Sequence, residues 1–570
     1  MLAVLATSLV VSVAYALSQL TLPSDAGSSC LAGPDSLTAT EFNSWFDAGV
    51  VSLNGSVMPA DSVHFPDRPN CTFYKWSEQM FLWLMSPAPP RYGGGGGLIM
   101  NSSAFYDVTP LDAMGHRHFV PHSSGLLPAF NVRAAQLGAL DLPVVMEKST
   151  LRLLEVLPTV FSREGRQMVM DQNGNQLEVA SARRSSTGTP ALFDVTGRQI
   201  QGPRAILQPE FAKKIDALGD FDKSELVQRL TLDDRSVVML DLSGSFPEAE
   251  QGQADGNVLM AQNGSLVYYT IIVNNVFALY RTMQGASVPA GTKFPLTQTD
   301  LNAITAFAAA NGQPPVIDSQ ALAIEIKTAW IESASLADPS QFIQMKAIVP
   351  VYDTSNPNDW VQTGTTTRML AMVGTHIVGS TGSMNPSNTN HGHPEMLWAT
   401  FEHLSNGPSA AYNYAKTPSG TGSVPQNTTG DWLFSSNGSA GPFNQAHIMT
   451  GAPGHLLPVS PFTISPSDTL RSMPFGLPGT TSATGNAEVI SINNKVRSLL
   501  DPADVRRNYF HEGTTWTIFG ASPTAGNQVG TNKLANTTLE TYFQGNNCFS
   551  CHTTSTTAVS HVFAVTDPLF

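Results

Sequence analysis

A five-residue pattern near the end of the chain constrains the fold more than any other feature. Cys548 and Cys551 are three positions apart, and His552 follows directly. Two thiols at this spacing can add to the two vinyl groups of one porphyrin, and the next residue can bind the iron, so C-x-x-C-H is the attachment pattern of a c-type haem. Only 18 residues follow His552. Because so short a tail cannot bury a porphyrin by itself, we expect the preceding chain to build the pocket.

Two other uses of these residues stay open. A structural zinc site needs four ligands, commonly two C-x-x-C pairs or one pair with two histidines. The sequence contains no second C-x-x-C pair, but His561 lies nine residues after His552 and could join it in a zinc site. A redox-active disulfide between Cys548 and Cys551 is the third interpretation.

The five residues resemble the haem-binding signature of c-type cytochromes. The whole chain, a long body ending in one such motif, resembles a group of large, poorly characterised bacterial cytochrome c proteins. The resemblance implies one covalent haem c with His552 as the proximal iron ligand. A small cytochrome c has a long stretch after the motif that supplies a distal methionine, and here the tail contains none. The candidates for the distal side are therefore His561 and, from the body, His376, His403 or a methionine such as Met372.

Two classes of function follow from the motif. The first is an exported monohaem cytochrome that exchanges electrons with a redox partner protein, or that serves a haem-dependent oxidative reaction in the large body. The second is an extracellular binding or sensing protein whose C-x-x-C-H site holds haem or zinc without catalysis. A six-coordinate iron would favour electron relay, whereas an open coordination position would favour catalysis or sensing.

Composition and the N-terminus both indicate export. Charged residues make up 13% of the 570 residues, the net charge is -14, and no Lys/Arg-rich run occurs; this argues against nucleic acid and anionic membrane as partners. Residues 1–16 carry no charge and end in Ala14-Tyr15-Ala16, which fits a signal-peptide cleavage site. That apolar run is too short to span a membrane, and no longer run follows, so no integral membrane span is expected. These features predict a bacterial periplasmic or secreted protein.

The two remaining cysteines agree with this location. Cys30 and Cys71 bracket 40 residues of the N-terminal region. In an oxidising compartment such a pair is expected to form a disulfide, and two separate buried thiols are the alternative.

The periodicity predicts an α+β chain: a β-rich body with antiparallel or mixed sheets, and a C-terminal helix and haem-binding tail docked on it. The expected regions are a signal peptide (1–16), an N-terminal mixed region (17–150), a β-rich module (151–290), a main sheet domain with long loops (291–530) and the haem-binding tail (531–570). Helices are expected over 75–85, 149–157, 299–310 and 532–544, and strands over 321–330, 342–349, 369–378 and 396–404. Asn173-Gly174 and Asn263-Gly264 predict hairpins, and no internal repeat is visible.

Histidines and carboxylates gather around the last of these strands. His391-Gly392-His393-Pro394-Glu395 precedes the strand 396–404, which ends in Glu402-His403, and His376 lies in the strand before it. Such groups on neighbouring strands could form a metal site or a proton-relay pocket that faces the haem. The alternative is that His376 and His403 are core histidines with satisfied hydrogen bonds.

Overall fold

The structure is a computed structural model. It describes residues 17–570 apart from residues 33–34, 65–69, 94–96, 111–115, 123–126, 133–139, 141, 143, 148–152, 186–188, 219–220, 234–236, 248, 251–256, 290–291, 383–395, 428, 452–453, 460–461, 477–482, 518–527, 532, 535, 543, 545–547, 551, 553–559 and 561. The expected signal peptide and the pattern His391-x-His393-x-Glu395 therefore lie outside the described residues. The expected β-rich α+β class is confirmed.

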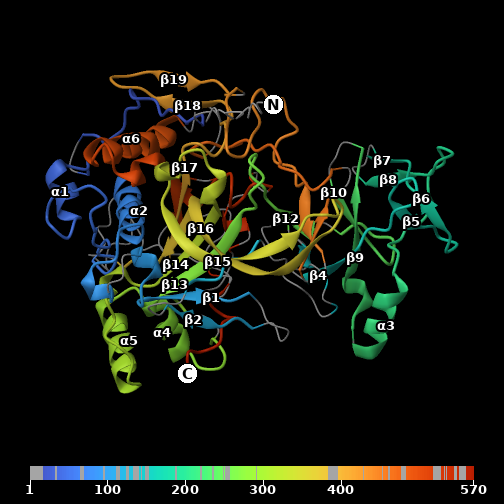
Figure 1. The fold of residues 1–570 in the computed structure, drawn as a ribbon, viewed down its shortest axis with the longest axis horizontal. Helices are drawn as coiled ribbons and strands as arrows, with labels where there is room; N and C mark the ends of the chain where they lie inside the picture. Colours follow the sequence, from blue (N-terminus) through green and yellow to red (C-terminus); the bar gives the residue numbers. More distant parts are fainter. Residues whose placement is uncertain are drawn as a thin grey trace, which may run out of the picture.

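A twelve-stranded antiparallel sheet forms the centre of the molecule (Figure 1). Its longest strand, β16 (Trp360–Gly379), pairs with β14, β15, β17 and β21. The four strands expected between 321 and 404 are confirmed. The other eleven members of the sheet are β1 (Phe105–Val108), β2 (Phe119–Pro121), β12 (Asn257–Val258), β13 (Tyr268–Asn274), β14 (Ile324–Glu332), β15 (Gln344–Asp353), β17 (Leu397–His403), β20 (Ile448–Thr450), β21 (His455–Pro458), β22 (Tyr509–Thr517) and β23 (Gln528–Gly530).

Helices pack on one face of this sheet. The helix α2 (Cys71–Leu84), expected from residue 75, lies against β22 and β17, with Phe81 stacked on Phe401 at a ring distance of 4.4 Å. The helix α6 (Ala483–Leu499), which the sequence did not predict, packs on α2 and β22. The short α1 (Ala39–Ser44) lies beside α6 (Figure 1).

Two further helices, α4 (Asn275–Met283) and α5 (Gln298–Ala310), pack against each other. The expected helix over 299–310 is confirmed as α5. It begins at a capping box in which the Thr297 hydroxyl accepts the Asp300 amide hydrogen and the Asp300 carboxylate accepts the Thr297 amide hydrogen.

The described part of residues 531–570, which we call the C-terminal segment, packs on the opposite face of the sheet. Alternate side chains of β17 contact it: Trp398 packs on Phe549, Thr400 accepts a hydrogen bond from the Asn536 amide, and Glu402 bonds the Thr537 hydroxyl. Neighbouring residues of a strand point to opposite faces. Trp398, Thr400 and Glu402 therefore face the C-terminal segment, whereas Phe401 between them faces α2. The expected docking of the tail on the body is therefore confirmed.

The expected helix over 532–544 is wrong for the described residues, which form successive turns. The side-chain oxygen of Asn536 accepts the amide hydrogens of Thr538 and Leu539, as an N-cap residue does, so the described chain before it is not helical. The bond from the Glu540 amide to the Asn536 carbonyl then marks one helical turn that is not continued. Polar side chains thus tie this part of the chain to local turns and to the sheet.

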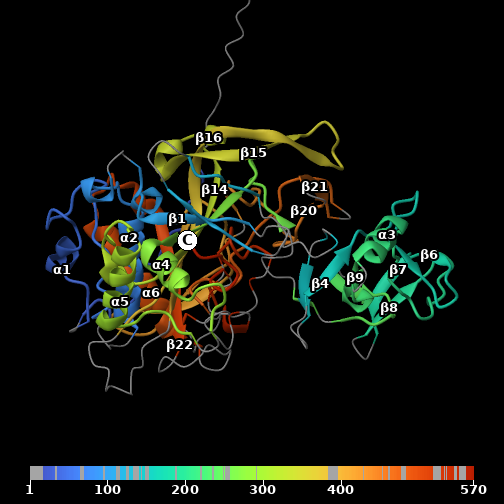
Figure 2. The same ribbon diagram turned by 90° about the horizontal axis from the view of Figure 1, so that it is seen from below.

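A second sheet forms a separate layer between residues 144 and 250, at the right of Figures 1 and 2. Its strand order is β10-β9-β4-β3-β11. The elements of this module are β3 (Val144–Glu147), β4 (Leu153–Leu157), β5 (Met168–Met170), β6 (Gln176–Glu178), β7 (Ser181–Arg184), β8 (Pro190–Phe193), α3 (Pro209–Leu218), β9 (Leu226–Thr231), β10 (Val237–Asp241) and β11 (Ala249–Glu250). The chain returns to the large sheet at β12, earlier than the boundary expected near residue 290. The helix expected over 149–157 is wrong for residues 153–157, which form the strand β4. This strand is paired on both sides, and its apolar residues do not alternate with polar ones, so a strand could not be told from a helix by periodicity.

Five of the described turns share one type, four of them in this module and one between β12 and β13 of the large sheet. Each turn spans five residues with Gly at the fourth position, and the first residue accepts the Gly amide hydrogen through its carbonyl; these turns are 162–166, 171–175, 194–198, 241–245 and 261–265. In three of them the first residue is an aspartate whose carboxylate accepts two further amide hydrogens: Asp171, Asp194 and Asp241. The Asn-Gly turns are therefore three-residue loops with only the Gly at positive φ, and the repeated x-x-x-Gly-x spacing is a signal that the sequence analysis missed.

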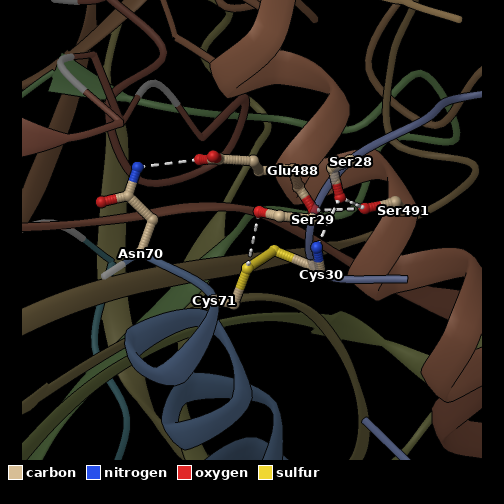
Figure 3. The surroundings of a disulfide bond; sticks show 7 residues. All are labelled: Ser28, Ser29, Cys30, Asn70, Cys71, Glu488 and Ser491. Carbon is tan, nitrogen blue, oxygen red and sulfur yellow. Dashed lines mark hydrogen bonds between the residues drawn. A yellow bond between two sulfur atoms is a disulfide. The ribbon is translucent and has the colours of Figure 1, made fainter. Parts of the chain in front are cut away.

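The expected disulfide between Cys30 and Cys71 is confirmed, with the two Cα atoms 5.3 Å apart (Figure 3). The disulfide joins the irregular N-terminal stretch around Cys30 to Cys71, the first residue of α2. Next to it, the Ser28 hydroxyl lies 2.5 Å from the Ser491 hydroxyl of α6, and the Asn70 amide donates to Glu488 of the same helix. The N-terminus, α2 and α6 are thus fastened at one point.

Candidate cofactor-attachment site

The C-x-x-C-H motif begins in a single 3-10 turn, Cys548–Ser550. The His552 amide donates to the Cys548 carbonyl at 3.0 Å, which closes a turn across the motif. Phe549 is fully buried, whereas Cys548 and His552 are partly exposed. Cys551 lies outside the described residues. The turn therefore buries the phenyl ring and leaves the first thiol and the imidazole near the surface of the C-terminal segment.

The support for the motif comes from the sheet. Trp398 lies in β17 between β16 and β22, where its cross-strand neighbours are Val378 and Thr515. The Phe549 ring meets the indole edge-on at 4.9 Å, and the His552 ring lies 6.0 Å from it at an interplanar angle of 53°. One buried side chain of the central sheet thus contacts two of the five motif residues.

These residues fit a covalently attached haem in their chemistry. The attachment needs two thiols and an imidazole that reach out from the backbone on which they are held. Cys548 and His552 meet this condition, because both keep partial exposure while Phe549 anchors the turn from below. The donor set is that of a c-type haem with an imidazole as one axial ligand.

His376 lies on β16 and reaches the C-terminal segment. Its Nε2 is 2.5 Å from Oε1 of Glu540, and both side chains are mostly buried. The other carboxylate oxygen of Glu540 accepts the Asn536 amide hydrogen at 3.2 Å. The body histidine therefore lies under the segment that carries the motif, with a carboxylate as its partner. Its expected position on the distal side of a haem stays a prediction.

His403 sits in the core and has partners for both ring nitrogens. Its Nε2 donates to the Gln341 carbonyl at 3.2 Å, and its Nδ1 accepts the Ser405 amide hydrogen at the same distance. The ring stacks on Phe342 at 3.8 Å and meets Tyr509 edge-on. Burial lowers the pKa of this imidazole to about 3. These contacts are those of a satisfied core histidine. The third distal candidate, His561, lies outside the described residues.

A buried ionic cluster, which the sequence analysis did not identify, lies under the same segment. Nε of Arg471 is 2.6 Å from Glu402 and 2.9 Å from Glu512, and all three side chains are buried. Glu402 also accepts hydrogen bonds from the Asn406 amide and the Thr537 hydroxyl. Because the members are far apart in sequence, no local pattern marks them. The cluster links β17, β22 and the loops that carry Asn406 and Arg471 to the C-terminal segment.

A second buried polar group lies between α2 and β22. His511 and Glu78 are both buried, with Nδ1 and Oε1 3.6 Å apart. Nε2 of His511 bonds the Thr514 hydroxyl at 2.7 Å, and Thr514 bonds the Ser77 hydroxyl at 2.6 Å. Burial raises the pKa of Glu78 to about 8 and lowers the pKa of His511 to about 3, so both groups are neutral at pH 7.

In comparisons with known proteins, no family model, no curated protein and no solved structure matches this chain. Within the part of the chain that the structure describes, no group of three or more histidine, cysteine, aspartate or glutamate side chains is placed to hold a metal ion. Among the described helices, none combines the length and the apolar character needed to cross a membrane.

Proposed function

We propose that this protein is an exported, monohaem c-type cytochrome that binds one covalent haem c at Cys548, Cys551 and His552 and exchanges electrons with a redox partner protein. The observation that carries the proposal is the arrangement of the motif: the partly exposed Cys548 and His552 flank a fully buried Phe549. A haem attached there would supply a one-electron redox centre.

The disulfide supports the location. Disulfides persist in oxidising compartments such as the bacterial periplasm or the cell exterior, and Cys30–Cys71 joins the start of the described chain to α2. The attachment of c-type haem outside the bacterial cytoplasm agrees with this. We therefore place the protein in the periplasm or outside the cell.

The chain's own residues hold and orient the redox centre. Phe549 anchors the motif turn on Trp398, and the His376–Glu540 pair fastens the preceding turns of the segment to β16. The buried cluster around Arg471 fixes the segment again through Thr537. A rigid support limits the rearrangement of the site on a change of charge, which suits electron transfer.

The test is expression in a bacterial host with and without c-type maturation. With maturation, the protein should stay coloured by haem after denaturing electrophoresis and show an increase in mass of one haem. The variants Cys548→Ala and Cys551→Ala should each lose one thioether, and the double variant should lose the covalent haem. The double variant Cys30→Ser/Cys71→Ser is the matched control, because it removes two cysteines and should keep the haem.

Two outcomes would refute the proposal. Haem that is released by acid-acetone extraction would show that no thioether forms. Stoichiometric zinc in place of haem would assign the cysteines to the zinc alternative. An absorption spectrum of the oxidised and reduced protein then separates a six-coordinate relay centre from an open site.

A further inference from the structure

Trp398 is placed to control the orientation of the motif histidine. It is a buried residue of a central strand, and its indole lies within ring-contact distance of both Phe549 and His552. The His552 backbone is fixed separately, since its amide donates to the Cys548 carbonyl. The turn thus holds the backbone of the histidine, and the indole lies next to its ring.

The strand that carries Trp398 gives it little freedom of its own. Val378 of β16 and Thr515 of β22 flank it in register, so the indole stands on a paired backbone on both sides. Side chains on such elements position functional groups more closely than loop residues do. The orientation of a ligating imidazole is in turn one of the properties by which a protein tunes an iron centre.

We propose that Trp398 is a positioning residue that sets the ring orientation of His552 and thereby the coordination and reduction potential of the iron. This inference rests on the proposed haem function. It adds a residue, 150 positions away in the sequence from the motif, whose role no pattern in the sequence indicates.

The first measurement needs no cofactor. In the variant Cys548→Ser/Cys551→Ser, selectively labelled histidine gives ring resonances, and His552→Gln identifies the one from His552. Replacement of the indole in Trp398→Leu, which keeps an apolar side chain but no ring, should move this resonance and remove the magnetic contact between the two rings. Trp398→Phe keeps an aromatic ring and should retain most of both. Trp516→Leu is the matched control, because Trp516 follows the cross-strand neighbour of Trp398 but packs on Phe73 of α2 at 4.1 Å.

The second measurement uses the protein with its haem. Trp398→Leu should keep the covalent haem but shift the reduction potential and alter the absorption bands that report on axial coordination, whereas Trp398→Phe and Trp516→Leu should match the wild type. An unchanged His552 resonance, or an unchanged potential and spectrum, in Trp398→Leu would overturn the inference. If no haem attaches to the wild type, the proposed function fails, and the ring measurement still shows whether Trp398 orients His552.

Discussion

Glu78 should make the stability of this protein fall as the pH rises through the neutral range. The carboxyl group is buried between α2 and β22, and burial raises its pKa to about 8, against about 4.3 for a glutamate in an unfolded chain. Between these two values the folded state holds a proton that the unfolded state has released. The stabilising contribution of the neutral acid is therefore complete below about pH 4 and is lost as the pH rises toward 8.

The neighbouring histidine limits the pH range in which this effect can be seen. The pKa of His511 falls from about 6.5 to about 3 on folding, so its contribution is present above pH 6.5 and is lost as the pH falls. His403, whose pKa is also about 3, acts in the same direction. Below pH 6.5 these histidines oppose Glu78. Above it they are neutral in both states and no longer oppose Glu78.

The magnitude follows from the width of that window. Each pH unit in which one proton separates the folded and unfolded states changes the unfolding free energy by about 1.4 kcal/mol. From pH 6.5 to 8 the loss due to Glu78 is therefore about 2 kcal/mol. The charged Arg497 of α6 lowers the pKa of the carboxyl but does not cancel the effect of burial.

The assay is denaturant unfolding at pH 6.5 and at pH 8.0 for the wild type and for Glu78→Gln. The glutamine keeps the shape and cannot ionise, so the variant should lose about 2 kcal/mol less than the wild type between the two values. Other titrating groups cancel in this difference. Glu210→Gln, at an exposed position of α3, is the control and should follow the wild type. Equal losses in the wild type and Glu78→Gln would refute a neutral buried Glu78.

Two further changes test how the C-terminal segment and the N-terminus are held. Gly374→Ala should loosen the C-terminal segment and speed its proteolysis, because the added Cβ would lie 2.4 Å from the Thr538 hydroxyl. Gly485→Ala is the control and should leave cleavage unchanged, because nothing lies within 4 Å of its added Cβ. Equal cleavage of the two variants would contradict the packing. Reduction of Cys30–Cys71, which closes a loop with a sequence separation of 41, should lower the unfolding free energy by about 4 kcal/mol in denaturant titrations; no change on reduction would show that the unfolded chain gains no freedom.

Local signals in the sequence predicted the elements that are marked by neighbouring residues, such as a capping box or an alternation of buried and less buried side chains. The helix α5 has its capping box in the four residues Thr297 to Asp300, and β14 alternates buried Ile324 and Ile326 with a less buried Glu325. The disulfide followed from the compartment, and the motif from its spacing. Each of these features is decided by residues close together in sequence or by one chemical rule.

The elements that the sequence analysis missed are decided by polar contacts between distant residues. The strand β22 is fully buried although it contains His511 and Glu512, and α6 buries Asn493. The amide of Asn493 donates to the His511 carbonyl and accepts the His511 amide hydrogen, both at 2.7 Å. The Asn493 side chain is acceptable in the core because it bonds the backbone of His511, and the His511 ring has its own partners in Thr514 and Glu78. The sequence of either element alone does not contain that information.

Contacts with distant residues also hold the C-terminal segment on the body. The described part of the C-terminal segment is rich in threonine and asparagine and forms successive turns. Its apolar side chains enter the clusters of the body: Leu534, Phe549, Val562 and Phe563 pack with residues of α4 and β17, and Leu539 packs with residues of β14 and β16. A segment whose named apolar side chains are buried against other elements has no core of its own to offset the entropy of ordering. The sheet therefore provides the support for the turns of the C-terminal segment.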